Sequence, residues 1–206
     1  MKTNRGFDLL APIYDSLARL VFGRSIVDSQ MWYLKEIPRG SSVLILGGGT
    51  GWLLEELQKH TPSCKVWYVE ISKNMLDRAR QRELKFNVHF IQGTEESIPP
   101  DLKFDVVITN FYLDLFSERA LVDVIKHIGF HTAESSTWLV TDFVNGRKLW
   151  HKLMLKIMYL FFKLVCRIDA NHLPEWARLL QNQGWKEAGE RFWYGDFIKS
   201  TVWKRS

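Results

Sequence analysis

The chain has 206 residues and a net charge of +5, with 46% hydrophobic and 25% charged residues. These values are typical of one soluble α/β domain that buries a core without disulfides or metals. Its two cysteines, Cys64 and Cys166, are too few and too far apart for a disulfide framework or a zinc site, so we expect no metal. The first residues lack a signal-peptide pattern, which predicts a cytoplasmic protein.

The first part of the chain predicts helices followed by alternating strands and helices. Residues 7–36 have the pattern of one or two helices interrupted at Pro12 and Gly23. Further on, we expect strands near 43–47, 65–70, 88–91, 104–109 and 137–143, with helices near 51–60, 73–82 and 117–130. Such alternation predicts a parallel sheet with helices on both faces.

The last part of the chain predicts two helices and two closing strands. The helical stretches cover 147–167 and 174–183, and the strands lie near 186–193 and 197–203. No repeat or linker divides the chain. We therefore expect a single domain over 1–206, with a helical arm or lid (1–40), a cofactor-binding half (41–145) and a substrate-side part (146–206).

A glycine cluster joins the first strand to its helix, and an acid ends the next strand. The glycines are Gly47, Gly48, Gly49 and Gly51, and the acid is Glu70. Glycines at such a turn let a ligand approach the backbone closely, and an acid at the neighbouring strand tip can hold a ribose diol. The spacing fits neither G-x-G-x-x-G nor a phosphate-binding G-x-x-x-x-G-K-[ST] loop. The pattern therefore favours a nucleoside cofactor.

Polar residues or glycines also end the later strands. Gly93 and Asn110 follow two buried apolar runs. Ligands of an open parallel sheet bind beyond the carboxyl ends of its strands. We therefore expect the tips at Gly47, Glu70, Gly93 and Asn110 to meet at one cleft.

These motifs resemble class I S-adenosylmethionine-dependent methyltransferases. The G-x-G-x-G turn at 47–51 and the acid-x-S-x-x-M-L segment at 70–76 carry the resemblance. It implies a Rossmann-like doubly wound seven-stranded sheet, mostly parallel with a C-terminal antiparallel strand, and S-adenosylmethionine as cofactor. The implied cofactor-binding residues are Tyr14, Gly47, Gly48, Gly49, Gly51, Glu70, Ile71, Met75, Gly93, Thr94, Glu95, Asn110 and Phe111.

The N-terminal segment Phe7-Asp8-x-x-Ala11-x-x-Tyr14-Asp15 is similar to that of the ubiquinone and menaquinone biosynthesis C-methyltransferases. This resemblance implies an arm folded over the cofactor, with Tyr14 facing the cleft. It also implies a small apolar or aromatic acceptor, such as a quinone or lipid. Two residues depart from the family pattern, because Ile45 and Thr94 stand where carboxylates are frequent.

Methyl transfer depends mainly on alignment of the reactants and needs a general base only when the acceptor loses a proton. The catalytic residue is therefore left open, with Tyr14, Tyr112 and Asp114 as candidates. Other polar residues near the expected cleft are Asn110, Asp142, His131 and His151. Residues 110–113 lack the Asn/Asp-Pro-Pro-aromatic motif of base-amine methylases, which makes a nucleic-acid acceptor less favoured.

The helix expected over 147–168 is unusually apolar. Its cations Lys152, Lys156, Lys163 and Arg167 fall within about 60° on a helical wheel. The remaining apolar face is wider than packing on a sheet requires. It predicts a second apolar neighbour, which could be the N-terminal helices, a bound lipophilic substrate, the surface of the inner membrane, or a second copy of the chain.

Two further functions stay open from the sequence. Residues 147–206 contain twelve Lys or Arg and five Asp or Glu, whereas residues 1–146 contain sixteen and eighteen. This basic third motivates an RNA-modifying methyltransferase. The departures at Ile45 and Thr94 motivate a non-catalytic, cofactor-binding scaffold.

Overall fold

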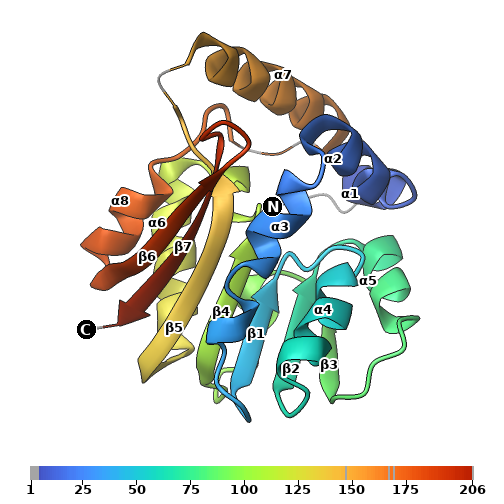
Figure 1. Cartoon of the computed structure of the whole chain (residues 1–206), viewed down its shortest axis with the longest axis vertical. Coiled ribbons are helices and arrows are strands. Elements are labelled where there is room, and N and C mark those ends of the chain that lie inside the picture. The colour runs from blue at the N-terminus through green and yellow to red at the C-terminus, as the bar shows by residue number, and fades with distance from the viewer. Residues whose placement is uncertain (1–4, 147, 167, 169, 206) are drawn as a thin grey trace.

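A computed structural model describes residues 5–146, 148–166, 168 and 170–205. These residues form a seven-stranded sheet in the order β3-β2-β1-β4-β5-β7-β6, in which β7 runs antiparallel to both neighbours (Figure 1). The strands are β1 (Ser42–Leu46), β2 (Lys65–Glu70), β3 (Val88–Gln92), β4 (Phe104–Asn110), β5 (Thr132–Phe143), β6 (Trp185–Trp193) and β7 (Ile198–Arg205). The predicted doubly wound fold is confirmed.

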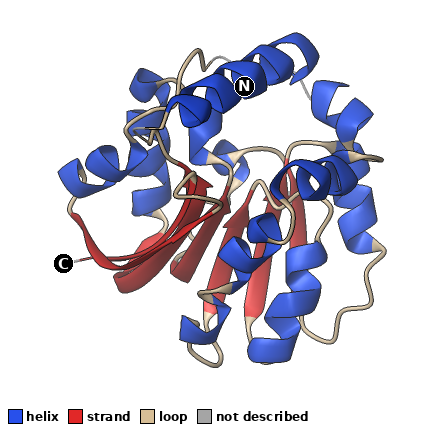
Figure 2. Ribbon diagram, turned by 45° about the horizontal axis from the view of Figure 1, so that its top comes forward, coloured by secondary structure: helices blue, strands red, loops and turns tan. Residues whose placement is uncertain are grey.

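Helices cover both faces of the sheet, as Figure 2 shows. The helices are α1 (Arg5–Leu10), α2 (Tyr14–Phe22), α3 (Ser25–Met31), α4 (Trp52–His60), α5 (Lys73–Arg80), α6 (Glu118–Phe130), α7 (Leu149–Cys166) and α8 (Trp176–Asn182), with short 3₁₀ turns η1 (Leu34–Glu36), η2 (Glu95–Ser97) and η3 (Leu113–Leu115). No helix in the described ranges is both long enough and apolar enough to cross a membrane.

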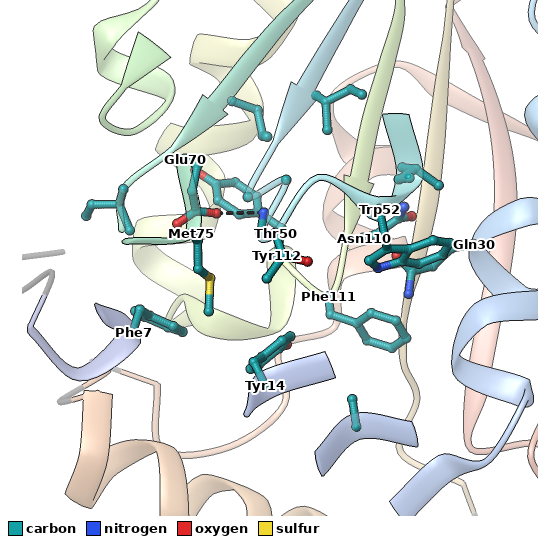
Figure 3. Close-up of a pocket in the computed structure, with 18 of the residues that line it drawn as sticks. Phe7, Tyr14, Gln30, Thr50, Trp52, Glu70, Met75, Asn110, Phe111 and Tyr112 are labelled. Carbon is teal, nitrogen blue, oxygen red and sulfur yellow. Dashed lines mark hydrogen bonds between the residues drawn. The ribbon is translucent and has the colours of Figure 1, made fainter. Parts of the chain in front are cut away.

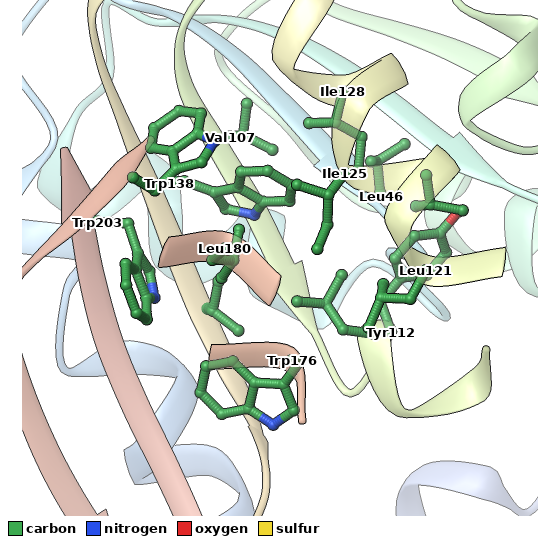
Figure 4. Packing of buried hydrophobic residues seen from close by; sticks show 14 of the residues in the cluster. Leu46, Val107, Tyr112, Leu121, Ile125, Ile128, Trp138, Trp176, Leu180 and Trp203 are labelled. Carbon is green, nitrogen blue, oxygen red and sulfur yellow. The ribbon is translucent and has the colours of Figure 1, made fainter. Parts of the chain in front are cut away.

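The alternation of side chains along the central strand explains this layering. On β1, Leu44 and Leu46 pack with α6 and α8, whereas Val43 and Ile45 pack with α4. Successive strand side chains point to opposite faces, so a strand buried on both faces reads as one continuous apolar run. Trp138, Trp176 and Trp203 fill the α6–α8 side (Figure 4).

A third group of helices lies across the carboxyl ends of the parallel strands. Figure 1 shows α7 as the outermost element there, with α1 and α2 beside it. Phe7 of α1 and Cys166 of α7 share one apolar cluster with Met75, and Phe22 of α2 and Leu155 of α7 share another. The arm and α7 therefore form a cover over the strand ends.

Two segments differ from the sequence expectations. The N-terminal region breaks at Pro12 and Gly23 as predicted, but it forms three short helices rather than one or two. Strand β5 begins at Thr132, five residues before the expected start. Residues 132–136 are mostly polar and give no apolar alternation, yet they extend the pairing with β4 across a register shift between Phe104 and Val106.

Candidate functional site

A cleft opens at the carboxyl ends of β1, β2 and β4, with about 1150 Å³ of space including its mouth. Figure 3 shows side chains from the strand tips and from the arm pointing into it. We call it the strand-end cleft. Eleven of the thirteen residues predicted for cofactor binding line it: Tyr14, Gly47, Gly48, Gly49, Glu70, Ile71, Met75, Gly93, Thr94, Asn110 and Phe111.

Hydrogen bonds to β2 hold the glycine turn in place. The amide N–H groups of Gly47 and Gly48 donate to the Val69 carbonyl at 3.0 and 3.3 Å. The Gly49 N–H donates to Glu70 Oε2 at 2.8 Å, and the Tyr68 hydroxyl donates to the Gly49 carbonyl at 3.0 Å. Because all three amides already have acceptors, they do not form the phosphate-binding nest that free N–H groups provide. The turn therefore suits a nucleoside without phosphates.

Glu70 is buried, and its carboxylate is oriented by two backbone donors. Oε2 accepts the Gly49 N–H, and Oε1 accepts the Ser72 N–H at 2.8 Å. Burial raises the pKa of Glu70, and the backbone hydrogen bonds oppose that rise. Each carboxylate oxygen keeps acceptor capacity, so Glu70 can accept hydroxyl groups from the cleft side, where Figure 3 shows it beside Met75.

Gly49 leaves space for a ligand. Its φ of +68° favours glycine, and a Cβ built there would meet no atom within 4 Å. The predicted residues Gly51 and Glu95 lie outside the cleft. Gly51 precedes α4, where a Cβ would lie 2.6 Å from that of Ala79, and Glu95 accepts a hydrogen bond from the Tyr112 hydroxyl at 2.5 Å.

The structure also shows what the two departing residues do. Ile45 lines the cleft wall as an apolar residue. Thr94 lines the cleft and is the N-cap residue of η2, where its Oγ1 accepts the Glu96 N–H at 3.3 Å. The Tyr112 ring lies against Gly47, and its hydroxyl is engaged by Glu95. Tyr112 therefore shapes the wall without presenting a free hydroxyl.

The arm is hydrogen-bonded to the turns that follow β1 and β2. Asp15 accepts the Thr50 hydroxyl at 2.6 Å. Asp8 accepts the Ser72 hydroxyl at 2.6 Å and the Asn74 N–H at 3.1 Å. Both acids belong to the Phe7–Asp15 segment singled out in the sequence. These bonds place the half-buried Tyr14 over the cleft, where burial and nearby carboxylates raise its pKa and keep the hydroxyl protonated.

Several lining residues were not predicted from the sequence. They come from the arm, from the turn before α4 and from the start of α4: Phe7, Asp15, Ala18, Arg19, Ile26, Val27, Gln30, Thr50 and Trp52. The spacing of four between Tyr14 and Ala18, and between Ile26 and Gln30, puts each pair on one helix face. The sequence shows this spacing, but the spacing does not reveal which face of each helix lies against the cleft.

A second cavity, of about 1030 Å³ including its mouth, lies between α2 and α7. We call it the helical cavity. Its walls are apolar and aromatic side chains, and Asp114 carries the one carboxyl group among the lining residues that the structure describes. It shares Tyr14, Phe111 and Leu115 with the strand-end cleft. Two ligands could therefore meet at this shared wall.

Asp114 is buried beside a second carboxyl group, that of Asp142. Asp142 accepts the N–H groups of Leu113, Asp114 and Phe143 at 3.0, 3.2 and 2.8 Å. Burial raises the pKa of Asp114 to about 7, and burial and the charge of Asp114 raise the pKa of Asp142. The three N–H donors oppose this rise at Asp142, and the two carboxyl groups lose their protons as an interacting pair.

Each cavity contains one buried polar atom without a hydrogen-bond partner among the described residues. These atoms are Nδ2 of Asn110 in the strand-end cleft and Oδ1 of Asp114 in the helical cavity. Because such atoms are costly to bury, an unpartnered one at a cavity wall marks a place for a ligand group.

The remaining sequence candidates do not line either cavity. His131 Nδ1 contacts the Leu102 carbonyl at 3.0 Å, and His151 Nε2 contacts the Gly195 carbonyl at 3.1 Å. Asp142 lies behind Asp114. Within the described ranges, no three His, Cys, Asp or Glu side chains form a group that could hold a metal ion.

Known proteins resemble this chain in sequence and in fold. A family model described as a methyltransferase domain matches residues 43–133. A malonyl-[acyl-carrier protein] O-methyltransferase of Halalkalibacterium halodurans is 33% identical over 119 residues, covering 52% of this chain and 42% of the relative. The chain thus spans about half the length of the curated relatives it matches.

Two solved structures extend the likeness to most of the fold. An S-adenosylmethionine-dependent methyltransferase from Aquifex aeolicus has a TM-score of 0.68 at 18% identity, with coverage of 97% of this chain and 98% of the other. Magnesium protoporphyrin IX methyltransferase from Synechocystis, with bound S-adenosylhomocysteine, has a TM-score of 0.66 at 18% identity and coverages of 89% and 83%.

Proposed function

We propose that this chain, a member of the class I S-adenosylmethionine-dependent methyltransferases, transfers a methyl group to a small apolar or aromatic acceptor. One observation carries the proposal: two cavities share a wall, and each has one unpartnered buried polar atom. The strand-end cleft would hold the cofactor and the helical cavity the acceptor.

The residues of the strand-end cleft fit an adenosyl cofactor. Glu70 would accept the ribose hydroxyls, and the open space beside Gly49 would admit the nucleoside. The amide of Asn110 would donate to a polar group of the ligand. The cofactor, when bound, supplies an electrophilic methyl group on a sulfonium. The chain supplies alignment at the shared wall and exclusion of water by α7 and the arm.

Asp114 is our candidate for the general base. A pKa near 7 leaves a large fraction of this carboxyl group ionised at neutral pH, as a base requires. It would take the proton that a hydroxyl or acidic carbon of the acceptor loses as its bond to the methyl group forms. Asp142 would act as a positioning residue, because it holds the Asp114 backbone N–H. Tyr14 would close the wall between the two ligands.

The apolar, covered helical cavity supports a small acceptor over a polynucleotide. The chain itself is tested by incubation with methyl-tritiated S-adenosylmethionine and either an organic-solvent extract of bacterial cells or bulk bacterial RNA. We expect label in the organic phase. Label confined to RNA would contradict the proposed acceptor class, and label in neither fraction would contradict the transfer.

Calorimetry with S-adenosylhomocysteine tests the cofactor site separately. We expect the Glu70→Ala variant to bind about 10–100-fold more weakly, because loss of a buried charged hydrogen-bond partner costs about 1–3 kcal/mol. Glu36→Ala, at an exposed acid outside the cleft, is the matched control and should bind like the unmodified chain. Equal affinity of both variants would argue against Glu70 as the ribose ligand.

A further inference from the structure

The solvent side of α7 carries a continuous apolar stripe. Five side chains, spaced three or four residues apart, are between 55% and 84% exposed: Leu149, Leu153, Ile157, Leu160 and Leu164. We call these residues the outer stripe. Single exposed leucines are common on protein surfaces, but a contiguous apolar patch marks an interaction surface. The outer stripe therefore needs a partner that covers apolar side chains.

Cations follow one edge of the outer stripe. At about 100° per residue, Lys152, Lys156 and Lys163 fall within about 40°, and the outer stripe occupies roughly the next 80°. All three lysines are exposed, and α7 contains no Asp or Glu. Arg167, which the sequence pattern grouped with them, lies outside the described residues. Among the residues that the structure describes, none of the three lysines forms an ion pair, so the face combines apolar side chains with positive charge.

The mouth of the helical cavity lies along the other edge of the outer stripe. Ile157 belongs to the outer stripe and also lines the cavity. Val21 of α2, which is 36% exposed, lines the cavity as well. Beyond Ile157 on the helical wheel lie Phe161 and Met154, which also line the cavity and are less exposed. Going around α7, the order is therefore lysines, exposed leucines, cavity mouth.

We propose that the outer stripe docks α7 on an anionic lipid bilayer, and that an apolar acceptor enters the helical cavity from the bilayer between Val21 and Ile157. The entry step rests on the proposed function, whereas the docking does not. An amphipathic helix with lysines at its polar edge lies in the plane of a membrane surface, where acyl chains cover the leucines and anionic headgroups attract the cations.

The order around α7 favours a bilayer over two other partners. An acidic carrier protein would pair with the lysines but would leave the outer stripe largely in water. A second copy of this chain would cover the stripe but would bring two sets of lysines together. A bilayer satisfies both features and also leaves the cavity mouth facing an apolar phase, so an apolar acceptor need not cross water.

Co-sedimentation with lipid vesicles tests the docking. We expect the unmodified chain to bind vesicles of equal phosphatidylglycerol and phosphatidylcholine more tightly than vesicles of phosphatidylcholine alone. The triple variant Leu153→Ser, Leu160→Ser, Leu164→Ser should bind at least tenfold more weakly, because three exposed apolar side chains no longer enter the acyl region. Phe130→Ser, at a 58% exposed aromatic on α6, is the matched control and should bind normally.

Charge variants separate the electrostatic contribution. Replacement of Lys152, Lys156 and Lys163 by Gln should weaken binding to anionic vesicles by about fivefold for each charge, with little change on neutral vesicles. Replacement of Lys35, Lys65 and Lys126 by Gln removes the same charge elsewhere on the surface and should leave vesicle binding unchanged. Equal losses in the two triple variants would show a net-charge effect and would overturn the proposed orientation.

Three other results would overturn the docking. The first is that the unmodified chain does not bind anionic vesicles. The second is that it binds an acidic acyl carrier protein through the three α7 lysines and does not bind vesicles. The third is a dimer in sedimentation velocity that the leucine variant abolishes. Calorimetry with S-adenosylhomocysteine in lipid-free buffer reports the cofactor site independently, so failure of one proposal is distinguishable from failure of the other.

Acceptor delivery tests the entry route. The organic extract is presented either in anionic vesicles or dispersed in detergent. We expect the leucine variant to lose methyl transfer from vesicles while it keeps transfer in detergent. An equal loss in both media would show that the outer stripe serves the fold or the chemistry, and an equal retention would show that the acceptor reaches the cavity by another route.

Discussion

The strand-end cleft is walled by strand tips and glycines whose backbone groups are hydrogen-bonded within the protein, whereas the helical cavity is walled by side chains of α2 and α7. The cleft positions polar atoms by backbone geometry, which leaves little freedom for the identity of its ligand. The cavity positions one carboxyl group within an apolar shell. Under the proposed function, side-chain changes in α2 and α7 would alter the acceptor without altering the cofactor site.

The largest expected effect comes from Asp114, whose carboxyl group lines the helical cavity. Asp114→Asn should lower methyl transfer by about 100-fold or more, because general-base catalysis contributes about 10²–10⁴-fold. It should leave the affinity for S-adenosylhomocysteine unchanged. Transfer by the unmodified chain should rise with pH through about 7 and then level off, because only the ionised Asp114 accepts a proton. An unaltered pH profile in the variant would remove Asp114 from the reaction.

A change in the strand-end cleft should give the opposite signature. Gly49→Ala places a methyl group in the open space of the cleft and should weaken S-adenosylhomocysteine binding by tenfold or more. The matched variant Gly40→Ala also has a positive φ and open space around the added Cβ. Both should lose about 1–2 kcal/mol of stability from the left-handed conformation. If both kept full affinity by calorimetry, the ligand would not approach Gly49.

The buried carboxyl pair should make stability depend on pH. The pKa of Asp114 rises from 3.8 to about 7 on folding, so the folded state is penalised as pH increases from about 4 to about 7 and the penalty persists above. Urea denaturation measures the free energy of unfolding. The difference between Asp114→Asn and the unmodified chain should therefore shift in favour of the variant by about 1–3 kcal/mol between pH 5 and pH 8. The exposed Asp123→Asn serves as the control, and equal behaviour of both variants would refute the burial penalty.

The smallest effect is expected where the arm joins the cleft. Asp15→Asn weakens the hydrogen bond that Asp15 accepts from Thr50 and should speed dissociation of S-adenosylhomocysteine several-fold, since one such bond contributes about 0.5–1.5 kcal/mol. Asp105→Asn, at a carboxylate that accepts from Ser42 away from the cleft, is the control. Stopped-flow dissociation rates that are equal in the two variants would show that the arm does not retain the ligand.

The sequence predicted the strand-end cleft better than the helical cavity, for a physical reason. Gly49 and Glu70 are 21 residues apart. Gly49 lies in the turn that follows β1, and Glu70 ends the adjacent parallel strand β2, so their meeting follows from local patterns and sheet topology. Phe22 and Met158 line the cavity from helices far apart in the sequence. Their meeting depends on how α7 crosses the strand ends, which periodicity alone does not determine.

The hydrogen bonds of the arm were likewise not predictable from local sequence patterns. Asp8 and Asp15 stood in a segment picked out by its resemblance, yet their partners Ser72 and Thr50 could not be read from spacing. Conversely, Gly51 and Glu95 were among the implied cofactor-binding residues, but Gly51 packs against Ala79 and Glu95 accepts a hydrogen bond from Tyr112. The implied cofactor-binding residues thus fall into two groups: most line the strand-end cleft, and two support its wall from outside.

Helix α3 is hydrogen-bonded to strand β7, which is synthesised much later than the helix. The Ser29 carbonyl accepts the hydroxyl of Ser200 on β7 at 2.7 Å, and the two residues are 171 positions apart. At a synthesis rate of about 5–20 residues per second, Ser29 leaves the ribosome roughly 10–30 s before this partner exists. During that interval the part of α3 that packs on β7 lacks its final contact. The newborn chain therefore completes the docking of α3, one of its first helices, among its last steps.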